Sequence, residues 1–135
     1  MPSPLECRKS QRIKVRFFLT HIKSGLTGEK LSGFTRDLSS GGLMFTSSVE
    51  YSLQDTVHLE INLSGWREFN PVINNPDIAG KEDTVVVSVK VLRAQRLDND
   101  LYCIAGSFIW VDNEYQKALE KYVNKQAKGG NAFFS

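Results

Sequence analysis

The chain of 135 residues is 41% hydrophobic and 24% charged, which predicts one folded globular domain and excludes a disordered chain. Its net charge of +2 excludes a general polyanion binder, although five cations, Arg8, Lys9, Arg12, Lys14 and Arg16, crowd the N-terminal end. We expect a cytoplasmic protein, because we find no signal peptide, no membrane span and no disulfide framework.

The first third of the chain alternates between extended stretches and turns. Residues 1–11 begin with a Pro-Ser-Pro sequence and are expected to form a mobile arm. Apolar and polar side chains then alternate over residues 12–20, which predicts a strand with one buried face. After a glycine-containing loop, we expect a second strand over about residues 30–38, a tight turn at 39–42 and a third strand at 43–46.

The rest of the chain predicts three more strands and one helix. Alternation or valine enrichment indicates strands over residues 57–63, 85–93 and 102–110. Residues 64–83 hold glycines, prolines and asparagines and predict a long loop, which is typically functional or mobile. Apolar residues at helical spacing predict a helix that starts near Asn113 and stops before Gly129.

Six strands joined by short turns and followed by a helix favour a mainly β fold. We expect a six-stranded antiparallel barrel with the C-terminal helix packed over one mouth. The domain boundaries are then an arm at residues 1–11, the barrel and helix at 12–128 and a loose tail at 129–135. The Phe133-Phe134 pair in that tail is either disordered or a surface for a partner or a homodimer. In the long loop, Trp66 and Phe69 either anchor a partner or pin the loop to the barrel.

Two short motifs carry the chemistry of the chain. The first is Arg-x-x-x-Arg, formed by Arg8 and Arg12 before the first strand. The second is Asp-x-Ser-x-x-Gly, formed by Asp37, Ser39 and Gly42 at the end of the second strand. A guanidinium pairs with a phosphate or with the O6/N7 edge of guanine, and a carboxylate accepts from the opposite guanine edge. Each motif alone is weak, since basic arms and hairpin turns also contain such residues.

Together, in their order and context, the two motifs resemble the signature of the PilZ domain family. The later strands, the Ile104–Phe108 segment and the closing helix are also similar, so the resemblance covers about residues 7–126. It implies a barrel that binds cyclic di-GMP, with no cofactor and no catalytic activity. It implies that Arg8 and Arg12 contact phosphates and guanine edges, and that Asp37 and Ser39 hold a guanine. Gly42 would supply backbone and clearance.

Four further residues are candidates for secondary contacts with the ligand. Cys7 and Lys9 flank the first arginine, and the family resemblance implies that the position of Cys7 influences whether one or two ligand molecules bind. Arg93 and Arg96 lie near the end of the fifth predicted strand, where a solvated strand end is the simpler interpretation. The two histidines lack partners at metal-ligand spacing, so no metal site is expected.

The sequence therefore predicts a bacterial cyclic di-GMP receptor that orders its arm on binding and signals to a separate effector protein. A PilZ-like module that binds proteins but no nucleotide is one alternative. A small barrel that binds single-stranded nucleic acid through its basic arm is another, and the low net charge argues against that one.

Overall fold

The computed structural model describes residues 12–23, 30–71, 82–98, 100–110 and 113–128. The predicted arm at 1–11 and the tail at 129–135 lie outside these residues, so their conformations stay predictions. The described residues form seven strands, one 3-10 helix and one α-helix.

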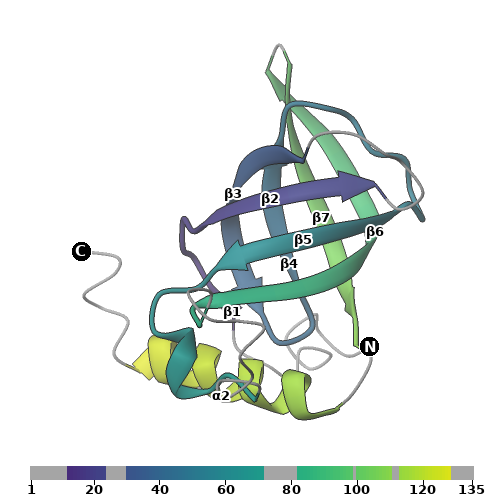
Figure 1. Ribbon diagram of the computed structural model, residues 1–135. Coiled ribbons are helices and arrows are strands. Elements are labelled where there is room, and N and C mark those ends of the chain that lie inside the picture. Colours follow the sequence, from purple (N-terminus) through teal and green to yellow (C-terminus); the bar gives the residue numbers. More distant parts are fainter. Residues whose placement is uncertain (1–11, 24–29, 72–81, 99, 111–112, 129–135) are drawn as a thin grey trace, which may run out of the picture.

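Six of the strands close into an antiparallel barrel, which confirms the predicted fold class (Figure 1). Around the barrel they follow the order β3-β2-β5-β6-β7-β4, and β4 returns to pair with β3. The seven strands are β1 Arg12–Ile13, β2 Phe18–Lys23, β3 Leu31–Ser39, β4 Gly42–Ser47, β5 Thr56–Asn62, β6 Thr84–Asp98 and β7 Leu101–Ile109.

The core lies inside the barrel, because one face of each strand is apolar. In β5, for example, Val57, Leu59 and Ile61 are buried, whereas His58 and Asn62 between and beyond them are exposed. The same alternation continues around the barrel, so its interior is filled with side chains. The free thiol of Cys103 is buried on β7.

The strand predicted over residues 12–20 is interrupted, and this is a correction to the sequence analysis. β1 and β2 both pair with β3, but residues 14–17 between them leave the regular ladder. The side chain of Thr35 fills the gap: its hydroxyl accepts from the Phe17 amide at 2.8 Å and donates to the Val15 carbonyl at 2.7 Å. The break therefore costs no buried hydrogen bond at these groups.

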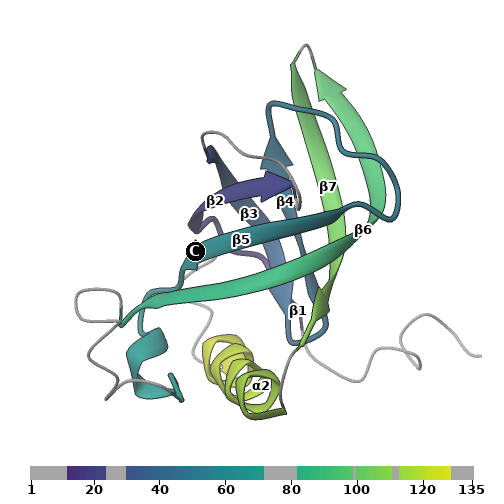
Figure 2. The same cartoon turned by 45° about the vertical axis from the view of Figure 1, so that its right-hand side comes forward.

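The hairpin of β6 and β7 is longer than the sequence indicated. β6 was expected to end near Arg93 but continues to Asp98, paired with β7 as far as Leu101. Two register shifts, between Val91 and Arg93 and between Arg96 and Asp98, accompany this extension. In two views the hairpin extends from the end of the barrel opposite to the α-helix (Figures 1 and 2).

The predicted C-terminal helix is confirmed as α2, Asn113–Lys128, and lies across one end of the barrel (Figure 2). Its buried residues are Ala118, Leu119, Tyr122 and Val123, which share one face at helical spacing. The helix thus buries its apolar face against the end of the barrel where β1 lies.

Part of the predicted long loop is ordered against this helix. Trp66, which begins the 3-10 helix Trp66–Glu68, is fully buried, and its ring lies edge-on to that of Tyr122 at 5.9 Å. Phe69 contacts the same tyrosine ring at 5.9 Å, and the Tyr122 hydroxyl donates to the Ser64 carbonyl at 2.7 Å. Of the two interpretations of Trp66 and Phe69, pinning of the loop is the one that the packing supports. Residues 72–81 of the loop are not described.

His21 on β2 is a fully buried histidine. His21 has no exposed surface, and its Nδ1 lies 2.6 Å from the hydroxyl of Tyr51. Burial lowers the pKa of His21 from 6.5 to about 4, because a charged imidazolium is poorly solvated there. The folded protein therefore keeps this ring neutral in mildly acidic solution, whereas an unfolded chain protonates it.

We expect this difference to make stability depend on pH between 6.5 and about 4. In that window the unfolded state binds one more proton at His21, so the free energy of unfolding falls as the pH falls, by at most about 1.4 kcal/mol per pH unit. Urea unfolding of the wild type and of His21→Gln across the window checks this. The wild type should show the steeper decline, and equal slopes would contradict the assignment.

Candidate functional site

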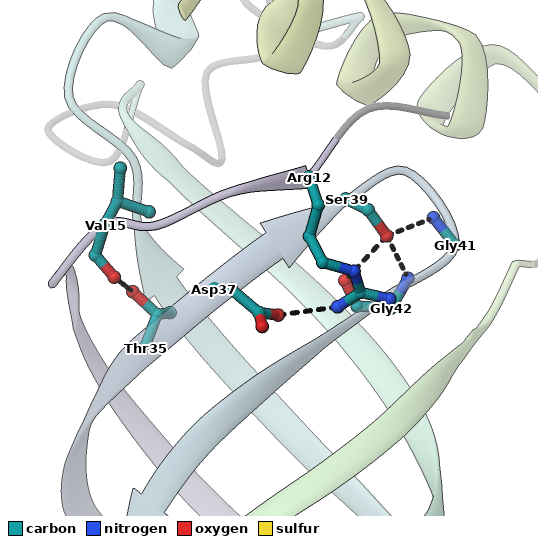
Figure 3. Close-up of polar contacts among 7 residues, drawn as sticks. All are labelled: Arg12, Val15, Thr35, Asp37, Ser39, Gly41 and Gly42. Atoms are coloured by element: carbon teal, nitrogen blue, oxygen red, sulfur yellow. Dashed lines mark hydrogen bonds and ion pairs between the residues drawn. The ribbon is translucent and has the colours of Figure 1, made fainter. Parts of the chain in front are cut away.

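The turn between β3 and β4 is organised by the hydroxyl of Ser39. This oxygen accepts from the amides of Gly41 and Gly42, each at 3.2 Å, and lies 3.2 Å from the Gly42 carbonyl, to which it can donate (Figure 3). Ser39 is almost fully buried. The serine of the second motif therefore has a structural task, since it satisfies backbone groups of its own turn.

The two sequence motifs meet at this turn. β1 pairs with the end of β3, with Arg12 opposite Ser39, and the Arg12 guanidinium lies 2.6 Å from a carboxylate oxygen of Asp37 (Figure 3). The side chain of Arg12 is 36% exposed and that of Asp37 is 14% exposed. Arg12, Asp37, Ser39 and Gly42 thus lie together at one end of β3, as the sequence analysis assumed.

The chemistry of this cluster suits an anion that also carries hydrogen-bond donors. One N–H group of Arg12 is used by Asp37, and a guanidinium has further N–H groups for an anionic ligand. The second carboxylate oxygen of Asp37 can accept further donors. An ion pair this exposed contributes about 1 kcal/mol or less to stability, so a ligand can rearrange it at small cost.

Gly42 is required by the barrel itself. A Cβ atom at this position would overlap the carbonyl oxygen of Gly106 on β7 and would lie 3.3 Å from the Cα of Ser107. β4 and β7 pair here, with Gly42 opposite Ser107. The close approach of two backbones therefore explains a glycine at this position, in addition to the clearance for a ligand that the sequence suggested.

Of the other candidate residues, three lie outside the described residues and two belong to the β6–β7 hairpin. Cys7, Arg8 and Lys9 lie outside the described residues, so their roles stay predictions. Arg93 and Arg96 belong to the projecting hairpin, where Arg96 pairs with Tyr102. Tyr102 lies five residues along β7 from Ser107, the partner of Gly42, which is roughly 17 Å at the rise of a strand. Arg96 therefore lies away from the β3–β4 turn. Arg93 pairs with Ala105, only two residues along β7 from Ser107, so its role as a secondary contact stays a prediction.

The end of β7 supports the β3–β4 turn through contacts that the sequence did not indicate. The Trp110 indole donates to the Ser40 carbonyl at 3.2 Å, and the Phe108 amide donates to the Gly41 carbonyl at 2.9 Å. The two rings pack with centroids 5.0 Å apart. The alternation over residues 102–110 places Phe108 and Trp110 on one face of the predicted strand, but their partners are distant in sequence and are set by the closure of the barrel.

Two negative findings apply to the part of the chain that the structure describes. Its histidine, cysteine and acidic side chains form no group of three or more that could hold a metal ion. None of its helices has the length and apolar character needed to cross a membrane.

Comparison with known proteins gives consistent results. The family model described as PilZ domain matches residues 6–125. Among solved structures, the "PilZ domain with c-di-GMP of YcgR from Escherichia coli" superposes with a TM-score of 0.63 at 12% identity, covering 93% of this chain and 95% of that chain.

The "Structure of K. pneumonia MrkH-c-di-GMP complex" matches with a TM-score of 0.66 at 14% identity, covering 93% of this chain and 54% of that chain. MotI/DgrA, the Bacillus subtilis inhibitor of motility, matches with a TM-score of 0.64 at 13% identity, covering 90% of this chain and 52% of that chain. The chain thus spans about half the length of these two proteins, and identities this low show the fold alone. A search of curated protein sequences found no match.

The geometry at Gly42 predicts a contrast between two adjacent glycines. Gly42→Ala forces β4 and β7 apart and should lower the free energy of unfolding by about 1–3 kcal/mol or more. Gly41→Ala is the matched control, because its Cβ would meet only the Ser39 hydroxyl at 3.9 Å, and it should change stability by about 0.5 kcal/mol or less. Urea unfolding measures both; equal losses would contradict the packing argument.

Proposed function

The chain belongs to the PilZ domain family, and from this premise we propose that it is a cyclic di-GMP receptor and not an enzyme. The observation that supports the proposal is the meeting of Arg12 with Asp37 beside the Ser39 turn. The solved complexes of the similar YcgR domain and of MrkH with c-di-GMP support the choice of ligand.

In this proposal Arg12 and Asp37 exchange partners when the ligand binds. A guanine base offers N–H donors to a carboxylate, as the guanidinium of Arg12 does to Asp37, so it can take the place of that guanidinium. The released guanidinium then pairs with a phosphate or with the O6/N7 edge of a guanine. The rigid Ser39 turn keeps Asp37 and Gly42 in place during this exchange.

We further propose that the arm of residues 1–11 supplies Arg8 as a second guanidinium and becomes ordered on the ligand. Ordering the arm costs conformational entropy, which the charged and stacking contacts have to exceed. The ordered arm together with the ligand forms a new surface that a separate effector protein recognises. The receptor acts in the cytoplasm of a bacterium.

The first test removes a guanidinium. We expect Arg12→Ala to weaken cyclic di-GMP binding by about tenfold or more, because a hydrogen bond to a charged group contributes about 1.5–3 kcal/mol. Arg8→Ala should act in the same direction. Isothermal titration calorimetry measures both, with Lys117→Ala on the exposed face of α2 as the control. Unchanged affinity in the two arginine variants would refute the proposal.

The second test concerns the choice of base. Adenine lacks the donor pattern that a carboxylate accepts from guanine, so we expect Asp37→Ala to reduce the preference for cyclic di-GMP over cyclic di-AMP. Calorimetric titration with each dinucleotide gives the ratio of the two affinities. A ratio identical to that of the wild type would exclude Asp37 as the residue that selects guanine.

A further inference from the structure

A basic groove lies along β3, next to the Arg12–Asp37 pair. It has a volume of about 630 Å³ and is formed by the irregular segment at residues 14–17 together with β3 and one residue of β4. Three cations line it, together with apolar and hydroxyl side chains. The cations are Lys14, Arg16 and Arg36, and the other lining residues include Phe17, Phe34 and Thr46. Neither Arg12 nor any residue of the Ser39 turn lines it.

The charges of the groove are not balanced by its own lining. Lys14, Arg16 and Arg36 are all exposed, and the described lining contains no carboxylate. Within the described ranges, none of these three cations forms an ion pair. Three like charges around one hollow repel one another, so the groove attracts a negatively charged occupant.

Arg16 is held in position by an aromatic ring. Its guanidinium carbon lies 3.9 Å from the centroid of the Phe34 ring, and the Phe18 ring packs edge-on against Phe34 at 5.9 Å. A guanidinium fixed in this way keeps its N–H fork available to a carboxylate and loses less conformational entropy on binding. It also occupies one face of the Phe34 ring, which is then not available for stacking with a nucleobase.

We propose that this groove binds an acidic, extended segment of the effector protein, in which aspartate or glutamate alternates with apolar side chains. The acidic groups pair with Lys14, Arg16 and Arg36, and the apolar groups cover Phe17. The inference rests on the proposed adaptor role and names the chemistry of its partner. Arg36 and Asp37 are consecutive residues at a register shift of β3, so partner and nucleotide sites share one strand without sharing a side chain.

Fluorescence anisotropy with a labelled short peptide of alternating glutamate, leucine and phenylalanine tests this inference on the full chain. We expect the double variant Arg16→Glu/Arg36→Glu to weaken peptide binding by about tenfold or more. Lys117→Glu/Lys121→Glu on the exposed face of α2 changes the net charge equally and should have little effect. The neutral variant Arg16→Gln/Arg36→Gln should show an intermediate loss, and circular dichroism verifies that each variant is folded.

Calorimetry with cyclic di-GMP separates this inference from the proposed function. The neutral variant Arg16→Gln/Arg36→Gln is the one to use here, because reversed charges next to Asp37 would themselves repel an anionic nucleotide. It should retain nucleotide affinity within about threefold, since the groove lining shares no side chain with the proposed nucleotide site. A parallel loss of nucleotide and peptide binding would assign the groove to the nucleotide and overturn the inference. Three other results would overturn the inference as well. They are equal losses of peptide affinity in the groove variant and the α2 variant, no measurable peptide binding, and tighter binding of a thymidine oligonucleotide than of the peptide. Peptide binding by a chain that fails to bind cyclic di-GMP would refute the proposed function alone.

Discussion

The end of β3 is hydrogen-bonded along both edges, and the candidate site depends on this double pairing. Leu38 pairs with Ile13 of β1 on one side and with Leu43 of β4 on the other. β4 in turn pairs with β7 through the close backbone contact at Gly42, so the barrel closes at this point. The β1–β3 pairing brings Arg12 beside Asp37, and the closure holds the turn that carries Gly42 next to them, at the end of the barrel where α2 contacts β1 and β3.

The sequence predicted the strands and the helix well, because both depend on the local periodicity of apolar residues. The prediction from the sequence was wrong where a residue distant in the chain determines the local conformation. The alternation from Arg12 to Thr20 is genuine, but between β1 and β2 the backbone bonds to the distant hydroxyl of Thr35 and leaves the regular ladder. The extra length of β6 depends on continued pairing with β7, and the burial of Trp66 depends on the ring of Tyr122. No local pattern contains that information.

The candidate site was predictable as a set of residue types and less so as a set of roles. The motifs identified Arg12, Asp37, Ser39 and Gly42, yet the hydrogen bonds of Ser39 and the packing of Gly42 show that both also maintain the turn itself. The sequence did not indicate the basic groove, because its cations belong to separate segments. The break after β1 and the irregularity before Asp37 bring these cations together.

The long β6–β7 hairpin has a consequence for solubility. Val91 still exchanges backbone hydrogen bonds with residues 54–55. Beyond it, β6 pairs with no described strand except β7, so its other edge could pair with a second chain. Leu97 is 40% exposed on this edge strand and would favour such aggregation. The irregular register and the charged Arg93 and Asp98 oppose it, because a kinked, charged edge is a poor template for another strand. The hairpin thus combines a risk of self-association with the features that limit it.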